Sequence, residues 1–219
     1  MIHYIDNFLP QDQFLALKAR VDGRFNTGDT SYLYEGSEEP VRITHHDHTG
    51  DWVEGCNFLG RECIPALDKM VATLEELGVT ELLNWSIWFQ YIINTMTLPP
   101  HQDQGLRSSD KEHTYTAILY TSDWQPGWGG EFIVGEPTYT EEDYKMMKEQ
   151  KVFPRAKGMK NLTHVVEPKP NRMLIWSREE WHAVQKVTNP DSDYVRSFFG
   201  SGWSSIDVQT AKGEFYDLQ

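Results

Sequence analysis

Apolar and polar residues alternate along much of the second half of the chain. From Asn84 to Ile93 an apolar side chain recurs at every second position. This predicts a β-strand, because successive side chains of an extended chain point to opposite faces. Similar runs bounded by glycine and proline turns predict further strands at residues 113–120, 131–134, 165–167, 172–176, 183–187 and 194–201.

The N-terminal part of the chain has a different period. After an expected strand at residues 2–8, a helix is expected over residues 10 to about 21. Apolar residues recur at helical spacing over residues 61–77, and Gly78 supplies a stop signal for that second helix. Residues 24–57 between the two helices are polar and rich in turns, without a clear period.

Two helices followed by a run of short strands predict a mainly β fold with flanking helices. We expect a jelly roll or a related double-sheet barrel with the helices packed outside. A chain of 219 residues is expected to form one domain. In that domain, residues 1–80 would give a helical N-terminal support and residues 81–205 the jelly-roll core, with boundaries that are approximate.

A short helix is also expected at residues 140–150. Thr140 is a suitable N-cap, and acidic residues follow it in the first turn. The segment lies in a long connection between two core strands, and such connections are often lids or binding loops. A lid over a site and a surface excursion are both compatible with this pattern.

Charge and cysteine content narrow the class of protein. The formal net charge of −13 repels phosphate backbones and no basic patch offsets it, which argues against a nucleic-acid partner. The two cysteines, Cys56 and Cys63, give no disulfide framework and fit a reducing compartment. The N-terminus has no apolar signal segment, and no stretch reaches the roughly 18 apolar residues of a membrane span. We therefore expect a cytoplasmic protein without a membrane partner.

The candidate chemistry lies at His101-Gln102-Asp103 and at His182. Residues i and i+2 of an extended chain point the same way, so His101 and Asp103 can reach one metal ion from one strand end. His182 begins a later alternating strand and supplies a second imidazole. Two imidazoles and one carboxylate form the facial triad suited to non-haem Fe(II), which leaves coordination positions open for a co-substrate and O₂.

A second His-x-Asp sequence competes with this one. His45 and Asp47 lie in a cluster at residues 45–48, and clustered histidines can also bind metal. We favour His101 and Asp103 because they follow a strongly patterned strand, whereas the cluster lies in the polar part before the predicted barrel. The cluster is expected to be a solvated or hydrogen-bonded loop.

Arg196 follows His182 across a predicted hairpin that turns at residues 189–191. An isolated arginine is usually solvated or paired with an acid, and Glu179 and Glu180 are the candidate partners. Inside a barrel close to an iron site, the planar guanidinium instead offers a fork for a carboxylate. Iron with open positions and a carboxylate anchor together indicate a 2-oxoacid co-substrate.

Several motifs follow one another along the chain: Tyr91, His101-Gln102-Asp103, Thr116-Ala117-Ile118-Leu119-Tyr120, Gly129-Gly130-Glu131, Pro168-Lys169-Pro170, His182-Ala183-Val184 and Arg196. Their order resembles the Fe(II)/2-oxoglutarate dioxygenases, most of all the prolyl 4-hydroxylase branch. The resemblance covers about residues 84–203. It implies a double-stranded β-helix, a cupin-like jelly roll, with Fe(II) held in its mouth by His101, Asp103 and His182.

The resemblance also implies how the co-substrate binds. The distal carboxylate of 2-oxoglutarate would pair with Arg196, assisted by the hydroxyl of Tyr120. Tyr91 would make a second co-substrate contact and Trp203 would line the site. Each tyrosine has an ordinary alternative as a core aromatic whose hydroxyl meets any nearby acceptor. Phe132 stands where some members have a threonine that touches the co-substrate, so that contact should be absent.

The function implied is hydroxylation of an unactivated C–H bond with Fe(II), 2-oxoglutarate and O₂, with His101, Asp103, His182 and Arg196 as the catalytic residues. A prolyl residue of a peptide or protein is the first expected substrate. Free amino acids or other small metabolites are an alternative, and the need for L-ascorbate and the oligomeric state stay open. A non-catalytic zinc or sensor barrel is disfavoured because structural zinc prefers a fourth strong protein ligand.

Overall fold

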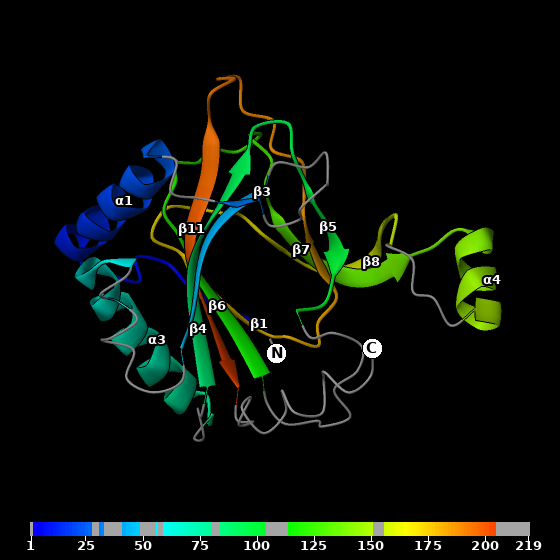
Figure 1. The fold of residues 1–219 in the computed structure, drawn as a ribbon, viewed down its shortest axis with the longest axis horizontal. Coiled ribbons are helices and arrows are strands. Elements are labelled where there is room, and N and C mark those ends of the chain that lie inside the picture. The colour runs from blue at the N-terminus through cyan, green and yellow to red at the C-terminus, as the bar shows by residue number, and fades with distance from the viewer. Residues whose placement is uncertain are drawn as a thin grey trace.

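The computed structural model describes residues 2–27, 31–32, 41–48, 56, 59–79, 84–103, 114–150 and 156–204. These residues form two antiparallel sheets that lie face to face, with helices outside them (Figure 1). The larger sheet has the strand order β1-β9-β6-β11-β4-β3-β2 and the smaller one β5-β10-β7-β8. The fold is therefore mainly β with flanking helices, and its core is a double-stranded β-helix, as predicted.

The elements have the following bounds. The larger sheet contains β1 (Ile2–Ile5), β2 (Ser31–Tyr32), β3 (Val41–His48), β4 (Asn84–Ile93), β6 (Thr114–Tyr120), β9 (Met173–Ser177) and β11 (Val195–Ser204). The smaller sheet contains β5 (Leu98–His101), β7 (Phe132–Thr138), β8 (Gly158–Val166) and β10 (His182–Val184). The helices are α1 (Gln11–Asn26), the 3-10 turn η1 (Arg61–Cys63), α3 (Ile64–Glu76) and α4 (Glu141–Gln150).

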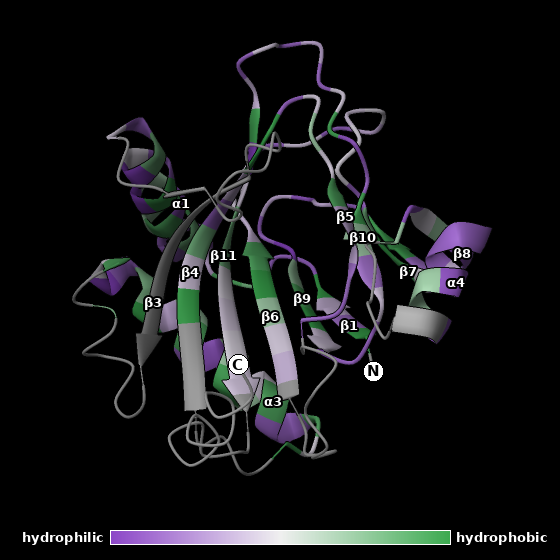
Figure 2. Cartoon of the chain, turned by 45° about the vertical axis from the view of Figure 1, so that its right-hand side comes forward, coloured by the Kyte–Doolittle hydropathy of each residue, from purple (hydrophilic) through white to green (hydrophobic). Residues whose placement is uncertain are grey.

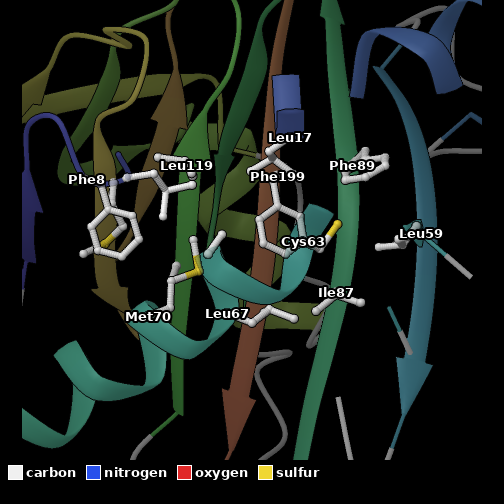
Figure 3. Packing of buried hydrophobic residues seen from close by; sticks show 14 of the residues in the cluster. Phe8, Leu17, Leu59, Cys63, Leu67, Met70, Ile87, Phe89, Leu119 and Phe199 are labelled. Atoms are coloured by element: carbon white, nitrogen blue, oxygen red, sulfur yellow. The ribbon is translucent and has the colours of Figure 1, made fainter. Parts of the chain in front are cut away.

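The outer face of the larger sheet is covered by α1 and α3 (Figure 1). Leu67 and Met70 of α3 are fully buried and lie against the sheet together with Ile87 of β4 and Leu119 of β6 (Figure 3). Burial of each such side chain stabilises the fold by roughly 1.5–3 kcal/mol. The helical apolar spacing at residues 61–77 predicted this face of α3 correctly.

The inner face of the larger sheet packs against the smaller sheet. Ile118 of β6 and Phe198 of β11 belong to the same buried cluster as Phe132 of β7 and Val184 of β10. Because side chains alternate along a strand, β4 and β11 present odd-numbered positions to the helices and even-numbered ones to the second sheet. This alternation decides which side chains reach the space between the sheets.

The polar segment before the barrel contains a strand that the sequence did not predict. β3 pairs with β4 over its whole length, from the Val41↔Ile92 pair to the His48↔Trp85 pair. The prediction of a loop at residues 45–48 is therefore wrong. Strand pairing here rests on backbone hydrogen bonds to an apolar neighbour, so the composition of β3 itself gave no period to detect.

Two connections also differ from expectation. β8 begins at Gly158, so β7 and β8 form a long hairpin that carries α4 at its far end (Figure 1). Thr140 caps α4 as predicted, because its Oγ1 accepts the Asp143 N–H at 3.1 Å while the Asp143 carboxylate accepts the Thr140 N–H. β10 and β11 belong to different sheets, so the turn at residues 189–191 crosses between sheets rather than closing a hairpin.

The N-terminal segment is fixed to the start of β9. β1 pairs with β9, and Asn171 holds the next turn through hydrogen bonds to both the N–H and the carbonyl of Leu9. The Arg172 guanidinium binds the Asp6 carboxylate through two nitrogens, at 2.5 and 2.9 Å. Within the described ranges, no helix combines the length and apolar character needed to cross a membrane.

Candidate active site

His101, Asp103 and His182 come together between the two sheets. His101 ends β5 and His182 begins β10, and the two residues are direct partners in the antiparallel β5–β10 pair. Their ring centroids are 4.3 Å apart. The Asp103 Oδ1 atom lies 3.5 Å from Nε2 of each histidine. The structure therefore brings the predicted triad together, with one potential ligand atom from each residue within 4.8 Å of the others.

The orientation of each histidine ring is fixed by a second contact. The Nδ1 atoms of His101 and His182 each lie 2.8 Å from a backbone carbonyl, of Pro99 and Glu180 respectively. A carbonyl accepts a hydrogen bond only from a protonated Nδ1, so each Nε2 presents its lone pair to the centre of the site.

Charge and burial also suit a metal ion. Burial by itself would lower the pKa of His101, but the contact with Asp103 and its negative charge raise that pKa. The same negative charge favours any cation at this Nε2 atom, a metal ion as well as a proton. Burial would raise the pKa of Asp103, yet the neighbouring imidazoles, His182 first, hold it well below its usual range. One ionised carboxylate and two imidazole nitrogens on one side of a point match the ligand set of non-haem Fe(II) with open positions opposite.

Arg196 is buried in the same interior as the triad. Its side chain is 1% exposed, and none of its three guanidinium nitrogens has a hydrogen-bond partner among the described residues. The guanidinium lies 4.9 Å from the Tyr120 ring centroid and 5.4 Å from that of Phe198. Burial lowers the pKa of Arg196, but a guanidinium stays charged in proteins. A buried unpaired cation is costly, so this position fits an anionic ligand.

Tyr120 and the double glycine complete this corner. The Tyr120 hydroxyl is buried and, like the guanidinium, has no hydrogen-bond partner in the described part of the chain. Gly130 adopts φ +77°, and a Cβ at that position would lie 2.8 Å from Cδ of Arg196. The Gly129-Gly130 motif therefore leaves room for the arginine stem.

One cavity joins the triad to Arg196. Its polar lining includes the three triad residues, Arg196, Gln90 and Thr116, and its apolar walls include Phe132 and Trp176. Phe132 stacks on the His182 ring with 5.0 Å between ring centroids, and Trp176 meets the same ring edge-on with 5.2 Å between centroids. A space lined by both metal ligands and a guanidinium matches the chemistry of a small dicarboxylate that chelates a metal through one end.

Two predicted site residues lie elsewhere. The Tyr91 hydroxyl donates to the Val21 carbonyl of α1 at 2.8 Å, and the Tyr91 ring packs on Phe25 at 5.0 Å. Trp203 belongs to the same helix-side cluster. Both occupy odd positions of their strands, which face the helices. The predictions that Tyr91 contacts the co-substrate and that Trp203 lines the site are therefore wrong.

Other cavity residues were missed by sequence reasoning. Gln90 falls between the apolar positions of its strand, so the sequence pattern predicts that it faces away from the core, but this face points into the site, and Gln90 is 6% exposed. Thr116 donates from Oγ1 to Oδ2 of Asp103 at 2.7 Å. Trp88 of β4 lies beside Gln90 in the lining. The sequence of β4 does contain a sign that both of its faces are buried, because large side chains occur on both faces of its central part.

Comparison with known proteins agrees with this site. The sequence profile of the 2OG-Fe(II) oxygenase superfamily matches residues 87–203, which include the whole triad and Arg196. No curated protein sequence matches the chain.

Among solved structures, a Pseudomonas putida prolyl-4-hydroxylase is similar with a TM-score of 0.61 and 20% identity, covering 93% of this chain and 91% of that one. A Trichoplax adhaerens prolyl hydroxylase in complex with a hypoxia-inducible-factor peptide fragment has a TM-score of 0.60 and 18% identity, covering 93% of this chain and 82% of that one. The carbocyclase SnoK from nogalamycin biosynthesis has a TM-score of 0.64 and 15% identity, covering 93% of this chain and 79% of that one. At these identities the likeness shows a shared fold.

These observations define the chain as an oxygenase of the double-stranded β-helix class. It belongs to the 2OG-Fe(II) oxygenase superfamily, and its reaction uses Fe(II), 2-oxoglutarate and O₂.

Proposed function

We propose that this oxygenase hydroxylates a prolyl residue of a peptide or protein at an Fe(II) ion held by His101, Asp103 and His182. The observation that carries the site assignment is the buried, unpaired guanidinium of Arg196 in the same cavity as the triad. The similarity to prolyl hydroxylases supports the substrate, since the chain shares their fold over most of its length.

The residues divide the work as follows. The carbonyl contacts at Nδ1 and the Thr116 hydroxyl hold the three ligands in place. Arg196 would hold the distal carboxylate of 2-oxoglutarate, and the Tyr120 hydroxyl would donate to the same group. Phe132 and Trp176 pack on the His182 ring and give the metal side an apolar wall. Iron with bound 2-oxoglutarate supplies the oxidising chemistry that hydroxylates the C–H bond.

A small-molecule substrate is the second candidate. The similarity to SnoK, with a TM-score of 0.64, is as high as the similarity to the prolyl hydroxylases. Residues of α4 do not line the described cavity, so this helix provides no argument for a closed pocket. The single-domain organisation over residues 1–219 and a cytoplasmic location belong to the same proposal, and the two buried free cysteines are consistent with the latter.

Succinate release tests both parts. The wild-type protein is incubated with 2-oxoglutarate, with and without Fe(II), and with proline-containing peptides, free amino acids or no substrate. We expect Fe(II)-dependent succinate release that a proline-containing peptide stimulates most. Stimulation by free amino acids alone would reject the peptide and favour the second candidate.

The triad assignment is tested with His182→Ala. This variant should lose turnover to the background level, because one of the three strong ligands is removed. His164→Ala is a matched control, since His164 is exposed on β8 and its ring forms a hydrogen bond with the neighbouring Thr163. Wild-type turnover by His182→Ala would end the assignment.

A further inference from the structure

Gln90 is a buried amide without a hydrogen-bond partner for its nitrogen. It lies in the middle of β4, is 6% exposed and lines the cavity that contains the triad and Arg196. Its Nε2 atom is fully buried and has no partner among the residues described here. Leaving a buried donor unpaired costs about 1–3 kcal/mol, so a group that accepts a hydrogen bond from it is expected at this position.

Strand register places Gln90 at the same level as the carboxylate-binding corner. Gln90 is the direct partner of Phe198 on β11, and Phe198 is the direct partner of Tyr120 on β6. Neighbouring strands are about 4.8 Å apart, so the Cα atoms of Gln90 and Tyr120 lie about 10 Å apart, with Phe198 between them. The Arg196 guanidinium extends over the Tyr120 and Phe198 rings. Gln90 and Arg196 thus line one cavity together with Phe198, and the register puts Tyr120 on the far side of Phe198 at the same level.

We propose that Gln90 is a third donor to the distal carboxylate of 2-oxoglutarate, beside Arg196 and Tyr120. This rests on the proposed binding mode, in which Arg196 holds that carboxylate. A carboxylate accepts about four hydrogen bonds. The arginine fork supplies two, the Tyr120 hydroxyl one, and the Gln90 amide the fourth. The neutral amide adds a hydrogen bond without adding charge, and it fills the role that the sequence had suggested for Tyr91.

The test is the affinity for 2-oxoglutarate, measured by calorimetry on Mn(II)-loaded protein so that no turnover occurs. Gln90→Met keeps the length of the side chain and removes the donor. We expect on the order of 10- to 100-fold weaker binding, the loss typical of one hydrogen bond to a buried charged group. Gln90→Glu should bind more weakly still, because it places a second carboxylate beside the first. Affinity for Mn(II) should stay within about twofold in Gln90→Met, since the candidate ligand atoms come from His101, Asp103 and His182.

Steady-state kinetics give a second readout. The contact is made equally in the ground state and the transition state, so Gln90→Met should raise the KM for 2-oxoglutarate and leave kcat nearly unchanged. If Gln90→Met does not fold, Gln90→Asn repeats the test with the amide withdrawn by one methylene, and roughly tenfold weaker binding is expected.

Tyr91→Phe is the matched control. It removes a hydroxyl bonded to Val21 on the helix side, so 2-oxoglutarate affinity should be that of the wild type. Gln185→Met makes the Gln90 change at an exposed position. Wild-type affinity in Gln90→Met, or a loss confined to Tyr91→Phe, overturns the inference. Absence of 2-oxoglutarate binding by the wild-type protein would overturn the proposed binding mode itself.

Discussion

At the scale of single residues, Asp103 shows how one carboxylate is prepared for a metal. Its two oxygens have different partners: Oδ2 accepts a hydrogen bond from Thr116, and Oδ1 faces both imidazoles at 3.5 Å. The hydroxyl therefore fixes which oxygen faces the metal position. Thr116 comes from β6 in the opposite sheet, so the ligand set depends on both sheets.

Removal of this hydroxyl should weaken metal binding. Thr116→Val keeps the shape of the side chain and should lower the affinity for Mn(II) or Fe(II) by about 10- to 100-fold, the usual cost of losing a partner of a metal ligand. Thr116→Ser should restore most of the affinity. Metal titration by calorimetry measures both.

Thr73→Val is the control for this change, because the Thr73 hydroxyl donates to Lys69 within α3 and is similarly buried. It should not change the metal affinity. Equal metal affinity in Thr116→Val and the wild type would show that Thr116 does not orient Asp103.

At the scale of elements, the turn before β7 is built on glycine. Gly129 adopts φ +67°, and a Cβ there would lie 2.0 Å from the Lys186 carbonyl oxygen. The Gly129 carbonyl accepts the Trp124 indole N–H at 2.8 Å, and Gly129 forms an isolated bridge with Val187. The turn is thus packed against the chain that leaves β10, where only a hydrogen atom fits.

Gly129→Ala should therefore destabilise the protein by about 3 kcal/mol, because a strained backbone and a steric clash act together. For a chain of this size the melting temperature should fall by about 6–12 °C. Thermal unfolding followed by circular dichroism measures the shift.

Gly127→Ala separates the two causes. Gly127 also has positive φ, +92°, but nothing lies within 4 Å of its added Cβ. It should cost only about 1 kcal/mol. A loss in Gly127→Ala as large as in Gly129→Ala would rule out the clash as the main cause.

At the scale of the whole molecule, the N-terminal segment is joined to the start of β9, far along the chain. Asp6 and Arg172 are 166 residues apart in sequence and form a two-pronged ion pair. Arg172 is 6% exposed, whereas the Asp6 side chain is about half exposed. The hydrogen bond from Arg172 lowers the pKa of Asp6.

This ion pair should contribute stability that depends on pH. A lowered folded-state pKa means that the contribution is complete above the unfolded pKa of about 3.9 and is lost as pH falls through the folded value. Because Asp6 is half exposed, solvent screening limits the effect to about 1 kcal/mol. Asp6→Asn should therefore be less stable than the wild type at pH 7, and the difference should shrink as the pH falls below about 4.

Urea unfolding at a series of pH values tests this, with Glu75→Gln on the exposed side of α3 as the control. The control should change stability little at any pH. A difference between Asp6→Asn and the wild type that is constant from pH 7 to the acid limit would contradict the ion-pair explanation.

Periodicity predicted α3, β4, β6 and β11 because each has an apolar face that must be buried somewhere. β3 escaped prediction, because its pairing depends on its neighbour β4. For the site, the predicted triad residues and Arg196 lie together as expected. Tyr91 was expected at the site, but its neighbour Gln90 lies there and Tyr91 faces the helices. Residues 87–92 of β4 include buried side chains on both faces, so the sequence pattern does not say which face meets the second sheet.

The sequence by itself indicated the class of chemistry of this protein, because the order of its motifs resembles that of the 2OG-Fe(II) oxygenases, and the family profile over residues 87–203 confirms that class. It also determined the mainly β fold with flanking helices, through periods that depend only on neighbouring residues. The tertiary structure alone decided which face of each strand points between the sheets. That choice follows from how the larger sheet is covered, with α1 and α3 on one side and the smaller sheet on the other, and so it depends on residues distant in sequence. Figure 2 shows the hydropathy of both sheets and the helices in this arrangement.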